Sequence, residues 1–403
     1  MIAVTVLAIP MYFSLMAIEL VYEALTKKRT YRLSDAITNI STGTLQQTTG
    51  VFFEIIKVGI YAAVYQQFAF YHLPSTALTF IAIFILYDLA YYWEHRMAHT
   101  VSLFWGGHVV HHQSEDYNLS VALRQTSTGF IWGFPFYLPL ALMGFEPKLF
   151  LLVGGLNLLY QFWIHTEHID KLPRWFEYIF NTPSHHRVHH GRNPKYIDKN
   201  YAGVFIIWDR LFGTFKLEEE RPTYGVTVPL RSWNPLHANF SHYGDLLKTV
   251  RQTRSVSDTF KVLFNKPGWQ PDYLGGQLHP TEPSTDYQKY NPTVLPAQSW
   301  YVLAHFLLLL ILVPIFFFIQ KDLPLPMRIG YAVWVMMTTL TFGFVFEKTG
   351  WWLKVFEIVR LIAMVAGAYF VGSILGLNLG LVLGVFVSLA VVSGVVFLGK
   401  VSK

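Results

Sequence analysis

The sequence contains no cysteine. Disulfide bonds, thiolate metal ligands and a cysteine nucleophile are therefore excluded. Charged residues are also scarce, at 14% of the 403 residues, against about 25% in typical soluble domains. Hydrophobic residues reach 53%, and several apolar runs approach the length of about 20 residues that a membrane-spanning helix needs. This composition predicts an all-α, polytopic membrane helix bundle.

Several motifs of other protein classes are absent as well. The sequence has no H-E-x-x-H zinc-protease motif and no G-x-G-x-x-G dinucleotide loop. It also lacks the Glu-x-x-His pattern of soluble di-iron bundles and the H-P-G-G haem sequence of fused cytochrome b5 domains. Basic residues beside apolar runs explain the net charge of +6, so nucleic acid is not an expected partner. Electrons for any redox reaction would have to come from a separate molecule.

The hydropathy pattern predicts about nine membrane spans. Five precede a long polar region, at about residues 2–20, 50–71, 77–93, 129–143 and 149–164. Four follow it, at about residues 297–319, 327–346, 355–375 and 377–398. Because cytoplasmic loops are rich in Lys and Arg, we expect the basic segment at 27–32 on the cytoplasmic face. The ends of the third and fifth spans then lie on the same face.

We expect three regions along the chain. Residues 1–169 form an N-terminal membrane bundle, residues 170–296 a cytoplasmic cap, and residues 297–403 a C-terminal region of four spans. The protein is then integral to the membrane with its site on the cytoplasmic face, in the endoplasmic reticulum of a eukaryote or the inner membrane of a bacterium. The sequence leaves the oligomeric state open.

Histidine is concentrated in one part of the chain. Eleven of the 16 histidines lie between His95 and His190, where an even spread would place roughly four. They follow the spacings H-x(3)-H, H-x-x-H-H, H-x-x-H and H-x-x-H-H. Positions three and four apart share one face of a helix, so each cluster can direct its imidazoles to one spot. Four such clusters on one membrane face indicate a metal site.

The number of imidazoles indicates two metal ions. Neutral imidazole suits iron, zinc and copper, and one metal seldom takes more than six ligands. A zinc hydrolase would need only three ligands, a water and a carboxylate base, so a pair of iron(II) ions that binds O₂ is favoured. Two alternatives from other classes stay open. A metal transporter would need histidines and carboxylates at mid-membrane depth, and a haem-b electron carrier would need single histidines on facing helices.

The spacing of the four clusters resembles the fatty acid hydroxylase and sterol desaturase superfamily of membrane di-iron oxygenases, over about residues 75 to 215. Within it, the stretch NTPSHHRVHHGRNPKYIDKNYAGVFIIWDRLFGTF at 181–215 resembles the alkylglycerol monooxygenase family. That resemblance implies two iron ions and hydroxylation of the ether-linked carbon of glyceryl ethers, whose product collapses to an aldehyde and glycerol. It also implies tetrahydrobiopterin as the reductant, with a separate electron-transfer protein as the alternative donor. Hydroxylation or desaturation of a sterol or fatty acid is the alternative reaction.

The resemblance also implies which histidines bind the metals: His95, His99, His108, His111, His112, His165, His168, His186, His189 and His190. We expect the extra His185 to support a ligand or to face the substrate.

Polar side chains around these clusters are expected to orient ligands or to line a substrate cavity. Asp88 lies two helical turns before His95, where its carboxylate either holds the second nitrogen of an imidazole or makes a hydrogen bond that packs two helices together. Asn157 and Gln161 form a polar stripe that leads to His165. This stripe either lines the cavity, which we favour, or hydrogen-bonds to a neighbouring helix. Further candidates are the carboxylates of Glu94, Glu115, Asp116, Glu167 and Asp198, with Asp198 favoured.

Overall fold

The computed structural model describes residues 4–284, 286–347 and 350–401. These residues form helices and loops without a β-strand, apart from one isolated bridge between Gly191 and Tyr224. Within them, seven helices are long and apolar enough to cross a membrane: α2 (Ile9–Thr26), α3 (Leu33–Phe68), α4 (Ala77–Thr100), α15 (Pro296–Ile319), α16 (Leu325–Glu347), α17 (Trp352–Ile374) and α18 (Leu379–Val396). The predicted fold class, an all-α membrane bundle with clustered histidines, is confirmed.

The expected count of nine spans is not confirmed, because two of the predicted spans are shorter. Residues 129–142 form three pieces, α7 (Gly129–Gly133), η2 (Phe134–Tyr137) and α8 (Leu138–Leu142). Pro135 and Pro139 lie at the starts of the second and third pieces, and each lacks the N–H that would continue the helical ladder. The next helix, α9 (Pro147–Trp163), has 17 residues, which at about 1.5 Å per residue is shorter than a bilayer core of about 30 Å.

Helix α3 begins 17 residues before the predicted span at residue 50. Its first half is polar but buried, so hydropathy alone does not reveal it. Asn39 donates to Ser120 Oγ at 3.1 Å, and Arg124 donates to Asn39 Oδ1 at 3.1 Å. Ser114 donates to Asp35 Oδ2 at 2.6 Å. These bonds join α3 to the loop that follows the second histidine cluster.

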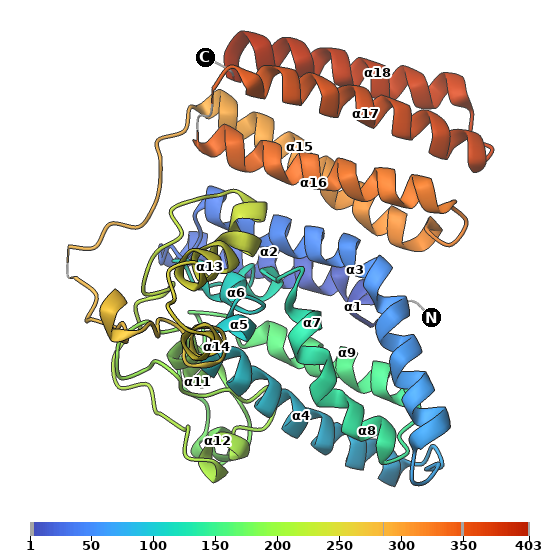
Figure 1. The fold of residues 1–403 in the computed structure, drawn as a ribbon. Coiled ribbons are helices and arrows are strands. Elements are labelled where there is room, and N and C mark those ends of the chain that lie inside the picture. The colour runs from blue at the N-terminus through green and yellow to red at the C-terminus, as the bar shows by residue number, and fades with distance from the viewer. Residues whose placement is uncertain (1–3, 285, 348–349, 402–403) are drawn as a thin grey trace.

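The long helices lie side by side, and the polar region gathers at one end of them (Figure 1). Helices α15–α18 form a layer next to α2 and α3, while α4, α8 and α9 lie on the other side of α2 and α3. Short helices α5 (Ser102–Trp105), α6 (Val109–His112), α10 (Arg174–Ile179), α11 (Pro183–His189) and α12 (Ile207–Leu211) follow the histidine-bearing ends of α4 and α9.

Two longer helices of the polar region, α13 (Pro235–Val250) and α14 (Val256–Phe264), lie at the same end and appear end-on in Figure 1. The end of α16 is fastened to this region, since Glu347 accepts hydrogen bonds from Ser232 Oγ at 2.7 Å and from the backbone N–H of Trp233. A shared apolar core of α2, α15 and α16 includes Tyr12, Leu309 and Val335. This packing holds the C-terminal layer against α2 and α3, which separate it from the histidine-bearing helices α4 and α9.

Candidate metal centre

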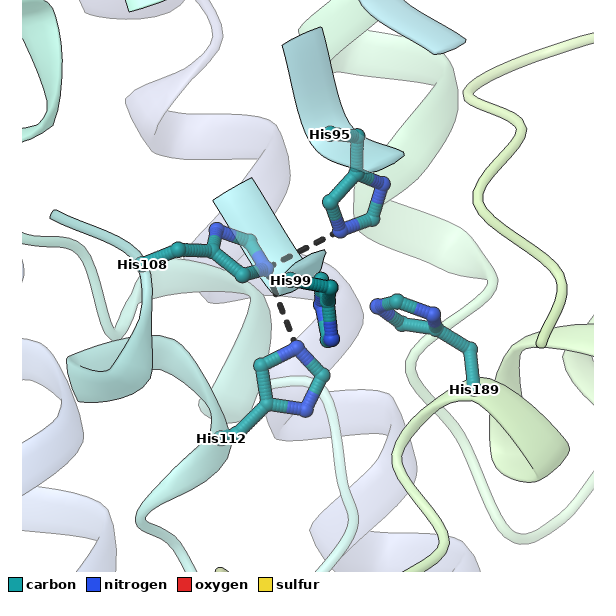
Figure 2. A group of neighbouring side chains, drawn as sticks. All are labelled: His95, His99, His108, His112 and His189. Atoms are coloured by element: carbon teal, nitrogen blue, oxygen red, sulfur yellow. Dashed lines mark hydrogen bonds between the residues drawn. The ribbon is translucent and has the colours of Figure 1, made fainter. Parts of the chain in front are cut away.

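Five histidines from three segments form the first group. His95 and His99 come from the last turns of α4, His108 and His112 from the segment around α6, and His189 from α11. One ring nitrogen from each lies within 4.8 Å of the corresponding nitrogen of every other member. Figure 2 shows the five rings turned toward a common point.

Four histidines form the second group: His111, His165, His186 and His190. Their nitrogens also lie within 4.8 Å of one another, and all four residues are buried. The two groups are adjacent, because the rings of His112 and His190 stack with centroids 4.3 Å apart. Nine of the ten histidines implied by the resemblance are thus brought together around two neighbouring points.

Each H-x-x-H-H motif contributes to both groups. In the first motif, His108 and His112 belong to the first group and His111 to the second. In the second motif the assignment is reversed, with His186 and His190 in the second group and His189 in the first. The residues four apart point the same way, while the residue between them points to the other group. The fourth residue of each motif, His111 or His189, therefore links the two groups.

Backbone carbonyl groups fix the orientation of at least four of these rings. The Nδ1 atoms lie 2.7 Å from Tyr201 O for His95, 3.0 Å from Arg124 O for His111, and 2.8 Å from Gln161 O for His165. The fourth, of His189, lies 3.0 Å from Lys199 O. A carbonyl oxygen only accepts, so Nδ1 carries the proton in each ring and Nε2 presents a lone pair. This is the usual arrangement of a metal-binding histidine.

The Nε2 atoms then face one another without a proton between them. His165 Nε2 lies 3.2 Å from His111 Nε2, although both rings carry their proton on Nδ1. Two lone pairs at this distance repel unless a cation lies between them. Two nitrogens bound to one ion at a right angle, with bonds of about 2.1 Å, would lie about 3.0 Å apart. The donor set therefore fits a metal ion.

Buried ring nitrogens without a hydrogen-bond partner also indicate a metal ion. Within the described residues, the Nε2 atoms of His99, His189 and His190 have no hydrogen-bond partner. Burying a polar atom without a partner costs free energy, and a metal ion would remove that cost. Burial away from water lowers the pKa of His111 to about 4 and holds that of His186 well below its usual value. At neutral pH these imidazoles are uncharged, as ligation requires.

His168 and His185 lie apart from both groups. The Nε2 atom of His168 is 3.4 Å from the hydroxyl of Thr30, and its ring packs edge-on against Tyr22. His185 is fully buried, and its ring packs edge-on against Phe215. The structure thus does not bring His168 to the other nine histidines, although it lies only three residues from His165.

Asp88 supports the site through a loop instead of holding a ligand directly. Its carboxylate accepts from the backbone N–H groups of Val204 and Phe205, at 2.8 and 2.9 Å, and from Trp208 Nε1 at 3.0 Å. The same loop carries the Tyr201 carbonyl that orients His95. The expectation that Asp88 itself contacts a ligand ring is not met in the structure.

The polar stripe of α9 divides into two parts. Asn157 is buried and donates to Asp88 Oδ1 at 2.7 Å. Gln161 donates to Asn157 Oδ1 at 2.6 Å and accepts from Tyr91 OH at 2.7 Å. Of the two, Gln161 lines the cavity described below. Asn157 therefore helps to hold the Asp88 carboxylate in place.

The other carboxylates expected near the ligands hold the polar region together. Asp198 lies 3.7 Å from Lys266 Nζ and has a backbone φ of 58°. Asp116 pairs with Arg32 and Lys289, each at 2.7 Å. Glu115 accepts from the N–H of Tyr290 and Glu167 pairs with Arg221, so these four carboxylates bond to residues outside the two groups.

Two supporting residues were missed from the sequence. Asp209 is buried and accepts from the backbone N–H groups of Tyr201 and Ala202, each at 2.8 Å. Arg187 is buried between the histidines of α11 and donates to both carboxylate oxygens of Glu218, at 2.8 and 2.7 Å. Both lie in the segment 181–215, and a charged residue inside an H-H-R-V-H-H motif was the available signal.

A cavity of about 420 Å³ opens beside both groups. His108 of the first group lines it, as do His111 and His165 of the second. Away from the histidines its apolar lining comes mainly from α2, α9, α15 and the segment 129–137, including Phe13, Phe134, Phe162, Leu310 and Val313. Helix α3 contributes Ile40 beside polar side chains. A cavity that joins buried imidazoles to lipid-facing helices is suited to a lipid chain.

The histidine-bearing part of the chain matches a known family. A family model described as fatty acid hydroxylase matches residues 80–214. The human alkylglycerol monooxygenase is 46% identical over 266 residues, which is 66% of this chain and 59% of the human protein. The Xenopus tropicalis alkylglycerol monooxygenase is 38% identical over 84% of this chain and 76% of that protein. No solved structure matches significantly.

The name of a more distant relative gives a substrate other than an alkylglycerol. The ornithine lipid hydroxylase of Rhizobium tropici is 27% identical over 32% of this chain and 40% of that protein. Its alignment is much shorter than those to the animal proteins, which extend over most of this chain.

Proposed function

This chain belongs to the alkylglycerol monooxygenase family, and we propose on that premise that it cleaves the ether bond of alkylglycerols. The chain is an integral membrane oxidoreductase that acts on a lipid. The structural observation that supports the proposal is the adjacency of two histidine groups to one cavity that reaches the lipid-facing helices. The relatives give no support to the metal-transporter alternative.

The proposed reaction inserts one oxygen atom of O₂ into a C–H bond of the ether-linked carbon. The second oxygen atom leaves as water, which requires two electrons and two protons from a donor. The hydroxylated ether is a hemiacetal, and it breaks at the C–O bond to give a fatty aldehyde and glycerol.

We assign two iron ions to the two histidine groups. The first would be held by the five histidines around His99, and the second by the four around His165. Iron, when bound, supplies the binding and reduction of O₂. The chain's own residues hold the imidazoles in place through the carbonyls of Tyr201, Arg124 and Gln161.

The cavity provides for a lipid entering from the side. Its apolar walls on α2 and α15 can receive the alkyl chain, while the polar head lies at the end lined by His108 and His111. Burial of both histidine groups keeps bulk water from the reacting carbon. Entry from the bilayer would let the substrate reach the site without leaving the membrane.

The electron donor is a separate molecule in this proposal, with tetrahydrobiopterin favoured over an electron-transfer protein. It would approach from the polar region 170–296, which we propose as a cytoplasmic cap between the membrane regions 1–169 and 297–403. The membrane would then be the endoplasmic reticulum in a eukaryote or the inner membrane in a bacterium.

The proposal is tested on membranes that contain the protein. Alkylglycerol, sterol and fatty acid are supplied in turn with O₂, with and without tetrahydrobiopterin, and aldehyde release and O₂ uptake are measured. We expect aldehyde from alkylglycerol only. The variant His189→Ala should insert into the membrane but lose turnover, and turnover of a sterol or fatty acid instead of the ether would reject the assignment.

A further inference from the structure

Glu94 presents its carboxyl group to the cavity. The residue lies in α4, immediately before His95, and lines the same cavity as His108, His111 and His165. Among the described residues, none forms a hydrogen bond or ion pair with the Glu94 carboxyl that meets ordinary distance criteria. Glu94 is only partly buried and its carboxyl opens into the cavity, so a donor group of a ligand that enters the cavity can reach it.

The neighbours of Glu94 leave room for its side chain but do not donate hydrogen bonds to its carboxyl. A Cβ atom at position 133 would lie 2.6 Å from Glu94 Oε1, so the glycine there gives the carboxyl its space. Tyr91 also lines the cavity, but its hydroxyl donates to Gln161 Oε1 at 2.7 Å. Gln161 in turn donates to Asn157 at 2.6 Å. Tyr91, Gln161 and Asn157 thus hydrogen-bond to one another, and the Glu94 carboxyl is left able to accept from a ligand.

Glu94 is also separate from the two candidate metal positions. Both groups of converging ligand atoms consist of histidines alone, although carboxylate oxygens could equally have joined them. Consecutive residues of a helix point about 100° apart, so His95 faces the first group while Glu94 faces the cavity.

We propose that the Glu94 carboxyl binds the free hydroxyl groups of a polyol head group. The inference rests on the proposed function and deepens it, because the substrate of that reaction carries two hydroxyls on the glycerol side of its ether bond. These hydroxyls are a few bonds from the ether-linked carbon. Their donation to Glu94 places that carbon toward the histidine groups and directs the alkyl chain along the apolar wall formed by α2 and α15.

The test compares hexadecylglycerol with its analogue in which both hydroxyls are methylated. For wild type, hexadecylglycerol should bind and turn over far better than the analogue. In Glu94→Gln, kcat/KM for hexadecylglycerol should fall by about 10- to 100-fold, mainly through KM, as expected for loss of a hydrogen bond to a charged group. Turnover of the methylated analogue should change little.

A second variant moves the carboxyl without removing it. Gly133→Ala places a methyl group against Glu94 Oε1 and should raise KM in the same direction. The matched control is Glu219→Gln, which removes the same charge from a half-exposed carboxylate of the polar region that lies 3.6 Å from Lys195 Nζ. Neither Glu219 nor Lys195 lines the cavity. This control should retain the wild-type KM.

Two further measurements separate this inference from the proposed function. Binding is followed without reductant, as the rise in melting temperature of detergent-solubilised protein on adding hexadecylglycerol, and iron per chain is measured for each variant. An unchanged KM in Glu94→Gln, with wild type cleaving the ether, overturns the role of Glu94 alone. Loss of iron in that variant also overturns it, because Glu94 would then be a metal ligand. Glu94-dependent binding without any oxidation by wild type would instead reject the proposed reaction and leave the head-group site standing.

Discussion

Asp88 accepts a hydrogen bond of 2.8 Å from the backbone N–H of Val204, which lies 116 residues later in the chain. The carboxylate also receives the N–H groups of Phe205 and Trp208. Because the carbonyl of Tyr201 in this loop orients His95, a carboxylate inside a long apolar helix controls the geometry of a proposed ligand that it does not touch.

The variant Asp88→Asn should therefore weaken metal binding. An amide has one oxygen acceptor where the carboxylate has two, so at least one donor of the 204–208 loop is left unpaired. Changes to such outer groups typically cost about 10- to 100-fold in metal affinity or activity. Iron per chain and ether cleavage should both fall. Asp245→Asn, at a side chain that is 70% exposed, is the control and should keep both.

The two histidines of the third cluster should differ sharply. His165→Ala removes a member of the second group and should abolish turnover and reduce bound iron. His168→Ala changes a ring that lies beside Thr30 and Tyr22 and should retain metal and most activity. Iron analysis of the two purified variants decides the point. Equal metal loss in both would contradict the division that the geometry suggests.

Removal of the metal should destabilise the protein. A ligand that binds only the folded state stabilises it by mass action, by about 4 kcal/mol when its concentration is a thousand times its dissociation constant. Chelation should therefore lower the melting temperature, and added iron(II) should restore it. In His165→Ala and His189→Ala combined, which removes a member of each group, the response to chelator should be much smaller. An identical response would indicate that the metal is bound elsewhere.

The wall of α15 should influence the preferred chain length. Leu310 lines the cavity, whereas the adjacent Ile311 is 60% exposed. Leu310→Trp adds volume to the wall, so KM should rise by about tenfold for long-chain ethers and less for short-chain ones. Ile311→Trp points to the lipid and should leave the preference unchanged. Competition between ethers of different length in one assay measures the effect directly.

Part of the structure could be predicted well because it depends on local properties. Apolar length and low charge were enough to identify the long helices α4 and α15–α18. The same two properties did not identify the first half of α3, whose Asp35 and Asn39 are buried by partners far along the chain. A hydropathy value depends only on the type of the residue. It is therefore the same for a polar side chain that is hydrogen-bonded inside the protein and for one that is exposed to water.

Composition and helical spacing were enough to predict a membrane bundle with a histidine-rich metal site, because both are properties of a few neighbouring residues. The three-dimensional packing was needed to show that His111 and His189 each join the group opposite their motif partners. It was also needed to show that His168 lies outside both groups and that Asp88 acts through a loop. Spacing fixes which side chains share a face of one helix. It does not fix which faces of distant segments meet, since that depends on the packing of the whole bundle and on hydrogen bonds that join residues more than a hundred positions apart.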